Sequence, residues 1–186
     1  HGAPRMHERP IDELTRALLD FARLEADAAL LHIEPRNLTE TVRAAMNAVR
    51  DAHPRRADFR LTAPGLVEAR FDEKWLRQAL FNLIKNAADH AGEPPVVTVT
   101  VQPGDGAARV TVRDNGPGVD AADLPRIFER FYRAKNSASG GLGIGLPLAR
   151  EIVRRHHGDI RAVQEASGTA FVVTLPILNC VEKTEN

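Results

Sequence analysis

The sequence predicts an α+β fold in which helices cover a largely antiparallel sheet. Two pairs of short alternating segments, 96–101 with 108–113 and 159–165 with 169–175, are each joined by a turn that contains glycine. Such pairs are typical of β-hairpins, whose strands run antiparallel. Amphipathic helical segments precede the first hairpin and lie between the two. The composition is that of a globular protein and excludes disorder, collagen and a coiled rod.

Charge and cysteine content exclude several classes of function. The 186 residues include 25 basic and 25 acidic side chains, and this zero net charge argues against a general binder of nucleic acid or of a membrane surface. The single cysteine, Cys180, excludes an internal disulfide and a cysteine-based zinc site. Without a long apolar run or a signal-peptide pattern, we expect a cytoplasmic protein, and a membrane anchor of the parent would lie elsewhere.

The N-terminal segment is predicted to hold one amphipathic helix. Residues 1–9 lack periodicity, and we expect them to be disordered or to come from outside the natural sequence. From Pro10 onward, apolar residues recur three, four and seven positions apart, which predicts a helix. Its apolar stripe consists of Ile11, Leu14, Leu18, Phe21 and Ala28, with Leu24 and Leu31 beside it. The stripe either packs on its own domain or pairs with a second copy of the chain.

A second helix and two short strands are expected next. The segment Asn37-Leu-Thr-Glu40 resembles a capping box and begins a helix that should end before Pro54. The pattern then changes to extended runs at 59–62 and 67–71. We therefore place a domain boundary near residue 50.

The next helix, from a cap at Asp72 to about His90, carries an unusual polar arc. One arc is apolar, whereas the other contains Asn82, Lys85, Asn86 and Asp89. A solvated face is the simple explanation, but asparagine is a poor choice inside an exposed helix. Two carboxamide oxygens one turn apart can reach one hard cation such as Mg²⁺. The arc is thus either a solvated face or part of a metal site.

The pentapeptide Asp114-Asn-Gly116-Pro-Gly118 directly follows a predicted strand. A tight turn explains it well. An acidic residue at the end of a strand can also accept a hydrogen bond from the exocyclic amine of a purine. The glycines that follow it would let such a ligand come close to the backbone. Both interpretations remain open from this segment alone.

A glycine-rich segment precedes the last predicted helix. A short helix near 124–131 and a polar stretch at 133–145 come first, and the helix spans about 146–157, with Pro147 in its first turn and Gly158 past its end. Glycines before a helix N-terminus expose N–H groups that bind anions such as phosphate, although a flexible loop is equally consistent. The segment is neither a Walker loop nor a dinucleotide fingerprint.

In their order along the chain, these elements resemble the catalytic ATP-binding domain of sensor histidine kinases, within the GHKL ATPase superfamily. Residues 82–87 resemble the N box, 114–118 the G1 box, 127–133 the F box and 141–146 the G2 box. The resemblance covers about residues 55–176. Upstream, residues 11–25 resemble the second helix of the dimerisation and phosphotransfer domain.

The resemblance implies a two-layer α/β sandwich of the Bergerat type, preceded by a helix of a dimerisation hairpin, with a mobile lid at 133–140. Asn86, helped by Asn82, would bind Mg²⁺, Arg133 would meet the γ-phosphoryl group, and these three would be the catalytic residues. Asp114 would accept the adenine amino hydrogen. Phe128 and Phe131 would anchor the lid by packing. The other expected nucleotide-binding residues are Gly116, Gly118, Tyr132, Lys135, Gly141, Leu142, Gly143, Ile144, Gly145, Leu146 and Thr169.

The implied reaction moves the γ-phosphoryl group of Mg²⁺–ATP to a histidine and then to an aspartate of a response regulator. The implied domains are residues 10–50, a partial dimerisation helix with a linker helix, 51–178, the catalytic domain, and 179–186, a tail. The implied partners are a response regulator, the parent's histidine-bearing domain and, in the full-length protein, a second copy. ATP or ADP and Mg²⁺ are the expected cofactors.

Two departures from the family pattern qualify these expectations. The phosphoacceptor motif is absent, and His1 and His7 lie too near the dimerisation-like segment to supply it, so we expect a fragment without its histidine substrate. Asp89 stands where the N box usually carries Lys or Arg. It would either face the triphosphate, weakening ATP binding without metal and holding Mg²⁺ when the ion is present, or turn to solvent or pair with Lys85. A regulatory module that holds nucleotide without phosphotransfer and an anti-sigma-type serine kinase are the alternative functions.

Overall fold

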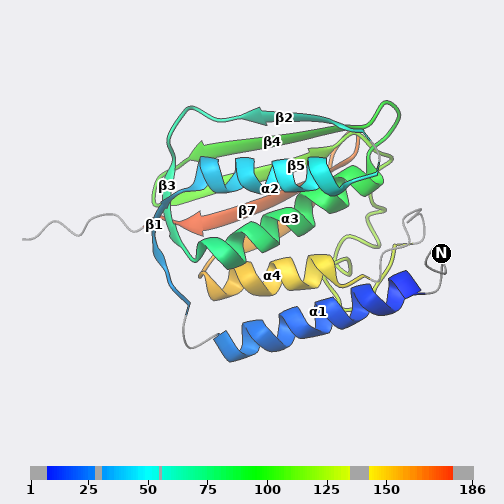
Figure 1. The fold of residues 1–186 in the computed structure, drawn as a ribbon. Coiled ribbons are helices and arrows are strands. Elements are labelled where there is room, and N and C mark those ends of the chain that lie inside the picture. The colour runs from blue at the N-terminus through cyan, green and yellow to red at the C-terminus, as the bar shows by residue number, and fades with distance from the viewer. Residues whose placement is uncertain (1–7, 28–30, 55, 135–142, 178–186) are drawn as a thin grey trace, which may run out of the picture.

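The computed structural model describes residues 8–27, 31–54, 56–134 and 143–177. It consists of two layers, a five-stranded sheet and a layer of helices on one of its faces (Figure 1). This arrangement confirms the predicted α+β sandwich. The elements in chain order are α1 (Glu8–Asp27), β1 (Glu34–Asn37), α2 (Leu38–Ala52), β2 (Asp58–Thr62), β3 (Glu68–Phe71), α3 (Glu73–His90), β4 (Val96–Pro103), β5 (Ala107–Asp114), α4 (Gly145–Arg155), β6 (Asp159–Gln164) and β7 (Thr169–Pro176).

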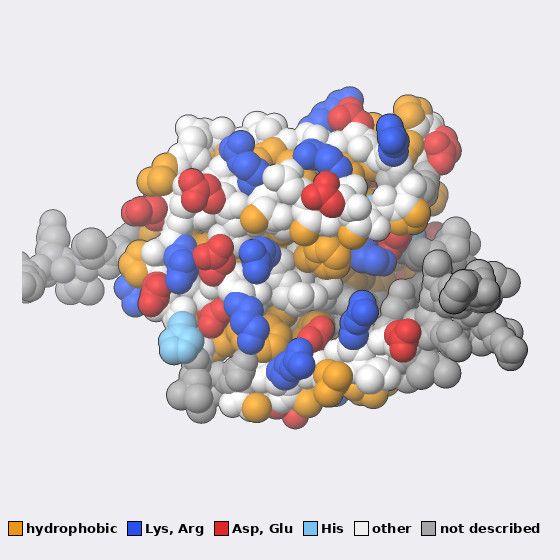
Figure 2. Space-filling view, viewed as in Figure 1, with side chains coloured by type: hydrophobic (Ala, Val, Ile, Leu, Met, Phe, Trp, Pro, Cys, Tyr) orange, Lys and Arg blue, Asp and Glu red, His pale blue; other side chains and the backbone are white. Residues whose placement is uncertain are grey.

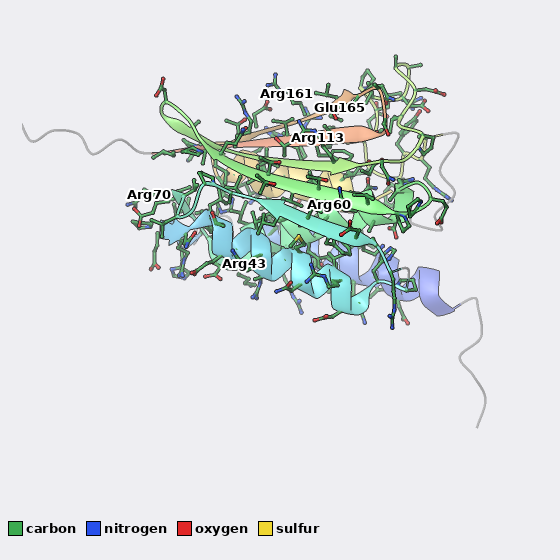
Figure 3. All side chains as sticks on the ribbon, turned by 90° about the horizontal axis from the view of Figure 1, so that it is seen from above. Arg43, Arg60, Arg70, Arg113, Arg161 and Glu165 are labelled. Atoms are coloured by element: carbon green, nitrogen blue, oxygen red, sulfur yellow. The ribbon has the colours of Figure 1, made fainter. Side chains whose placement is uncertain are left out.

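The sheet has the strand order β2-β4-β5-β7-β6. The two predicted hairpins, β4–β5 and β6–β7, are both present, and β5 pairs antiparallel with β7. Only the pairing of β2 with β4 is parallel within this sheet. The sequence did not predict β1, which forms a small separate sheet with β3. Figure 3 shows Arg113, Arg161 and Glu165 on the sheet face that points away from the helices.

Side-chain caps begin two of the helices where the sequence predicted them. The Asn37 carboxamide oxygen accepts hydrogen bonds from the N–H groups of Thr39 and Glu40 at 3.0 and 3.3 Å. The Asp72 carboxylate accepts one from the N–H of Trp75 at 3.2 Å. Such caps satisfy N–H groups that have no partner inside the helix. The starts of α2 and α3 are therefore local properties of the sequence.

The predicted short helix near 124–131 is wrong. The segment is a run of turns, in which N–H groups mostly bond the carbonyl three residues earlier, as from Arg126 to Asp123 and from Glu129 to Arg126. Phe131 closes the run with a φ of 66°, a left-handed conformation that no helix continues. Its N–H instead donates to the carbonyl of Gly143, at the start of the last helical segment.

The helical layer packs on the sheet through one continuous core. The apolar arc of α3 is buried as predicted, and Leu76, Leu80, Leu83 and Ile84 are fully covered. The buried face of α2 belongs to the same core, so α2 covers the sheet together with α3 and α4. On the face of the molecule that Figure 2 shows, acidic and basic side chains are interspersed.

Helix α1 packs against α4 with part of its apolar stripe. Phe21 and Leu24 are buried, whereas Leu18 and Leu19 are 53% and 48% exposed. The guanidinium of Arg130 lies 4.2 Å from the centre of the Phe21 ring, and Arg155 donates to the Leu24 carbonyl at 2.9 Å. One part of the apolar surface of α1 therefore packs on its own chain, and another part forms an exposed apolar edge.

A buried histidine joins the end of α4 to the start of α3. His156 is 1% exposed, its Nδ1–H donates to the Ile152 carbonyl at 2.8 Å, and its Nε2 accepts the N–H of Asp72 at 3.0 Å. Because Nε2 accepts, the imidazole is neutral in this arrangement. Burial lowers the pKa of His156 below its ordinary value. Protonation would remove the acceptor that Asp72 uses.

This geometry predicts acid-sensitive stability. The pKa of His156 in the folded state lies below its unfolded value of about 6.5, so its contribution is complete above that pH and is lost as the pH falls through the folded-state pKa. In urea unfolding between pH 7 and pH 5, we expect His156→Gln to show a shallower loss of unfolding free energy than the unsubstituted chain. Parallel pH profiles of the two proteins would contradict the prediction.

Candidate functional site

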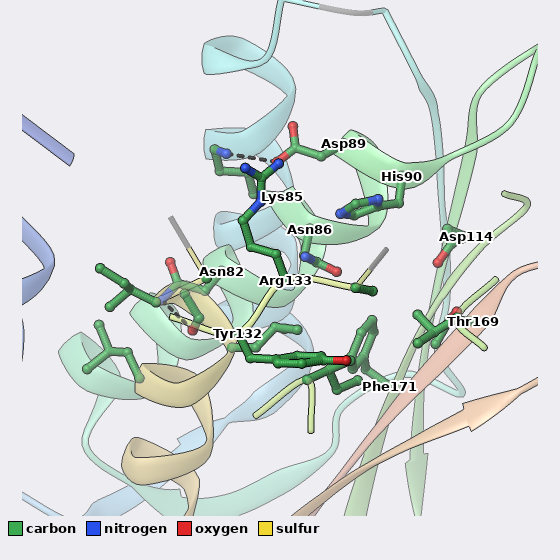
Figure 4. A pocket seen from close by; sticks show the side chains of 18 of the residues that line it. Asn82, Lys85, Asn86, Asp89, His90, Asp114, Tyr132, Arg133, Thr169 and Phe171 are labelled. Carbon is green, nitrogen blue, oxygen red and sulfur yellow. Dashed lines mark hydrogen bonds and ion pairs between the residues drawn. The ribbon is translucent and has the colours of Figure 1, made fainter. Parts of the chain in front are cut away.

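A cavity of 410 Å³ lies between α3, the N-terminus of α4 and the segment 117–134 (Figure 4). It gathers most of the residues that the sequence nominated, although they come from five separate parts of the chain. Gly116 does not line the cavity, and Lys135, Gly141 and Leu142 lie outside the described residues. The nominated residues that line it are Asn82, Asn86, Asp114, Gly118, Tyr132, Arg133, Gly143, Ile144, Gly145, Leu146 and Thr169.

The two asparagines of α3 differ in their contacts. Asn82 accepts a hydrogen bond from Gln78 at 3.3 Å and donates to the Gly145 carbonyl at 3.2 Å, which ties α3 to the start of α4. The Asn86 side chain lines the cavity and makes no hydrogen bond to any residue that the structure describes. Its carboxamide oxygen is therefore the better placed of the two for a hard cation.

Metal binding here would depend on more than protein ligands. Within the described residues, no group of three His, Cys, Asp or Glu side chains could hold a metal ion. Mg²⁺ commonly uses one or two protein oxygens and completes its shell with water and phosphate. The asparagine pair therefore fits a cation that arrives with a polyphosphate.

Asp114 is a buried carboxylate in the cavity wall, at the end of β5. It is 6% exposed and accepts hydrogen bonds from the N–H groups of Gly116, at 2.8 Å, and of Thr169. Burial raises the pKa of the Asp114 carboxyl, and these two N–H groups act in the opposite direction. A carboxylate fixed in this way can still accept a hydrogen bond from an amine in the cavity, because each oxygen has two acceptor positions.

The glycines of the loop after Asp114 are required by the protein's own packing. A Cβ on Gly116 would lie 1.9 Å from the His90 carbonyl oxygen, and a Cβ on Gly118 would lie 2.1 Å from the Gln164 side chain. Gly118 also has a φ of 80°, where other residues are strained. The loop thus needs both glycines with or without a ligand.

The N-terminus of α4 forms the far end of the cavity. Its N-cap residue, Ile144, provides no side-chain hydrogen bond, and the first turn has no acidic residue. Free N–H groups and the positive end of the helix dipole therefore face the space beside Asn82. An anion would satisfy these donors.

The turn segment before the last helix contributes aromatic side chains. The Tyr132 hydroxyl donates to the Asp123 carboxylate, and the guanidinium of Arg126 lies 4.2 Å from the centre of the Tyr132 ring. Phe128 packs edge-on against Phe171, with ring centres 6.3 Å apart, as expected for an anchor. Phe131 was expected to anchor as well, but it is 60% exposed, because its left-handed backbone turns the side chain outward.

Several lining residues were not nominated from the sequence. His90 follows Asn86 by four positions, so its helical spacing could have revealed it. Burial lowers the pKa of His90, whereas nearby Asp89 and Asp114 raise it. Arg16 and Asp20 of α1 also line the cavity, and no local pattern predicted this, because only the tertiary packing brings α1 there.

Asp89 lines the cavity, but both of its oxygens have protein partners. Lys85 lies 2.9 Å from Oδ2 and His53 lies 2.7 Å from Oδ1. The alternative in which Asp89 pairs with Lys85 is therefore confirmed. The carboxylate is not free to face a triphosphate alone.

A protein-family model matches this part of the chain. Residues 71–179 match the model for the histidine kinase-, DNA gyrase B- and HSP90-like ATPases. The chain belongs to this ATPase family. The matched range contains the cavity walls formed by α3, β5, α4 and β7.

Similar proteins include a bacterial histidine kinase and a bacterial sensor protein. The signal transduction histidine-protein kinase AfsQ2 of Streptomyces coelicolor is 36% identical over 90% of this chain and 31% of its own length. The sensor protein IrlS of Burkholderia pseudomallei is 35% identical over 81% of this chain and 34% of its own. The chain thus spans about a third of the length of these relatives.

Solved structures of this ATPase family agree with the fold. The mycobacterial sensor histidine kinase MprB superposes with a TM-score of 0.70 at 28% identity, covering 77% of this chain and 97% of that one. Full-length ShkA, solved in complex with AMPPNP, gives a TM-score of 0.74 at 29% identity over 88% of this chain and 35% of its own.

Among the described helices, none has the length and apolar character needed to cross a membrane.

Gly116 provides a test of the loop packing. We expect Gly116→Ala to cost at least about 2 kcal/mol of stability and to lower Tm by about 4 °C or more, because its Cβ would meet the rigid carbonyl of His90. Gly145→Ala is the matched control, since its Cβ would meet Asn82 only at 3.8 Å. Calorimetric melting of both variants decides the question, and equal Tm values would contradict this account of the loop.

Proposed function

We propose that this chain is the catalytic ATP-binding part of a sensor histidine kinase, which transfers the γ-phosphoryl group of Mg²⁺–ATP to a histidine. The observation that carries the proposal is the polarity of the cavity. A buried carboxylate, Asp114, stands at one end, and the uncapped N-terminus of α4 stands beside Asn82 at the other (Figure 4). An adenine amine suits the first end and a polyphosphate suits the second.

Different residues would contact different parts of the nucleotide. Asp114 would accept the adenine amino hydrogen, Thr169 and Tyr132 would lie beside the nucleoside, and the N–H groups near Gly143 and Gly145 would bind phosphate. Asn86, with Asn82 beside it, would hold Mg²⁺. The ion would neutralise charge on the phosphates and orient them.

The transfer step needs alignment and charge neutralisation from the protein. The bond between the γ-phosphorus and the β,γ-bridging oxygen breaks, a phosphorus–nitrogen bond forms to a neutral imidazole, and ADP leaves. Arg133, which lines the cavity opposite α3, would stabilise the charge that moves onto the transferring group. The imidazole proton is released to solvent after transfer.

Further elements of the parent kinase follow from this assignment. The phosphoacceptor histidine would belong to a separate dimerisation domain, and the phosphoryl group would pass to an aspartate of a response regulator. The exposed edge of α1 at Leu18 and Leu19 supports a homodimer in the full-length protein. For the domain division, the burial of α2 in the common core favours a catalytic unit that begins before residue 38 rather than near residue 50.

The alternative of a regulatory module without phosphotransfer has lost its main support. That alternative was supported best by Asp89, an acidic residue where the N box usually carries Lys or Arg for the phosphates. Both oxygens of Asp89 have partners, so the carboxylate does not argue against productive ATP binding.

Nucleotide titration tests the binding roles. We expect Asp114→Asn to weaken ATP binding about 10- to 100-fold, because a hydrogen bond to a buried charged group is lost. Asn86→Ala should weaken it about 10-fold in Mg²⁺ and leave metal-free binding unchanged. The control is Asn47→Ala, which removes an exposed asparagine of α2 whose carboxamide oxygen accepts a hydrogen bond from Arg50. Unchanged affinity in both site variants, measured by calorimetry, would refute the site.

Transfer can be tested with a supplied acceptor. Incubated with radioactive ATP and a separately produced histidine-bearing helix pair of the parent kinase, the chain should label that acceptor in an acid-labile form. Arg133→Ala should reduce the transfer rate by at least about 100-fold and ATP affinity much less, since its contact matters most in the transition state. Equal losses of rate and affinity would show that Arg133 only binds, and absence of label with intact ATP binding would refute the kinase assignment.

A further inference from the structure

A small charged cluster lies at the edge of the cavity, where α3 ends. Lys85 and Asp89 are one helical turn apart and form an ion pair of 2.9 Å, and both line the cavity. In this order, with the cation nearer the helix N-terminus, a pair of this kind adds little to helix stability on its own. Helix stability therefore does not explain the pair.

The Asp89 carboxylate is held more firmly than a surface pair would be. Its second oxygen accepts a hydrogen bond of 2.7 Å from Nε2–H of His53, whose side chain is 3% exposed. His53 is the C-cap residue of α2, and its backbone N–H donates to the Val49 carbonyl. The end of α2 therefore fixes Asp89, and Asp89 in turn restrains the Lys85 ammonium.

The cluster presents positive charge to the cavity. Figure 4 shows Arg133 extending from the opposite wall toward Lys85 and Asp89. Lys85 and Arg133 are basic and Asp89 is acidic, so basic side chains outnumber acidic ones in this cluster, which favours an anion at this corner. Asn82, Asn86 and the N-terminus of α4, which face phosphate in the proposed function, border the same space.

We propose that Lys85 is the cation on α3 that contacts the β- and γ-phosphates of ATP, and that Asp89 and His53 are positioning residues that hold it. This inference rests on the proposed function. A lysine side chain loses much rotational freedom when it is fixed on a ligand. The His53–Asp89 pair restrains it before the nucleotide binds, so less freedom is lost in binding. Asp89 thus acts through Lys85 rather than by repelling phosphate.

The first test compares nucleotides that differ in phosphate number. In calorimetric titrations of the full chain, Lys85→Met should weaken ATP binding at least tenfold and leave AMP binding within twofold. Lys74→Met is the matched control, because it removes the same charge from the same helix. The Lys74 side chain stacks over Trp75 and does not line the cavity. An ATP affinity equal to that of Lys74→Met would overturn the inference.

The second test asks whether Asp89 acts through Lys85. If Asp89 were only a repelling charge, Asp89→Asn would tighten ATP binding by the same factor with Lys85 or with Met at position 85. Positioning predicts that the two factors differ by at least fivefold, with the smaller gain, or a loss, when Lys85 is present. Equal factors would overturn the role of Asp89.

The third test addresses His53, whose burial makes substitutions risky for folding. His53→Gln keeps an N–H that can reach Asp89 and should retain ATP affinity, whereas His53→Leu should weaken ATP binding about threefold and leave AMP unchanged. In Lys85→Met the His53→Leu effect should disappear, which a purely structural role would not produce. An equal loss for ATP and AMP would overturn the role of His53.

Failure of the inference differs from failure of the proposed function. If Asn86→Ala and Asp114→Asn weaken ATP binding but Lys85→Met does not, only the role of Lys85 is overturned. If the unsubstituted chain binds no ATP, or if all three substitutions leave binding unchanged, both are overturned.

Discussion

The burial of one arc of α3 against the sheet is the constraint on which the site depends. Leu76, Leu80, Leu83 and Ile84 are fully covered, and truncating such a side chain typically costs about 2–5 kcal/mol. This burial fixes the rotation of the helix about its axis. Since each residue advances the helix by 100°, a slip of one position would turn Asn86 away from the cavity. The same packing that stabilises the core therefore also sets the direction in which the polar arc of α3 points.

The loop after β5 depends on the position that α3 takes. Gly116 lies directly against the carbonyl of His90, the last residue of that helix, and leaves no room for a Cβ. Asn115 accepts hydrogen bonds from the N–H groups of Gly92 and Val96, and its amide donates to the Pro94 carbonyl. These contacts place the end of β5 and its buried carboxylate at a fixed distance from the helix. One wall of the cavity thus positions the other.

Charge at the site is arranged by long-range contacts. The His53–Asp89 hydrogen bond joins residues 36 positions apart, and it changes the effect that Asp89 would have on a polyphosphate in the cavity. An isolated Asp89 would oppose a polyphosphate, whereas the paired one restrains Lys85. Helix α1 adds Arg16 and Asp20 to the wall after its Phe21 and Leu24 pack on the chain itself. The candidate site and the packing of α1 therefore share one surface.

The sequence by itself determined the elements whose causes are local. The caps at Asn37 and Asp72, the two hairpins and the apolar arc of α3 follow from contacts within a few residues, and all were predicted correctly. The order of the motifs also predicted the family, and most of the residues that it nominated line the cavity. Only the tertiary structure decided the turns around Phe131, the pairing of Asp89 with His53 and the path of α1. Each of these depends on groups far apart in the chain, whose distances are set by packing that periodicity and spacing do not encode.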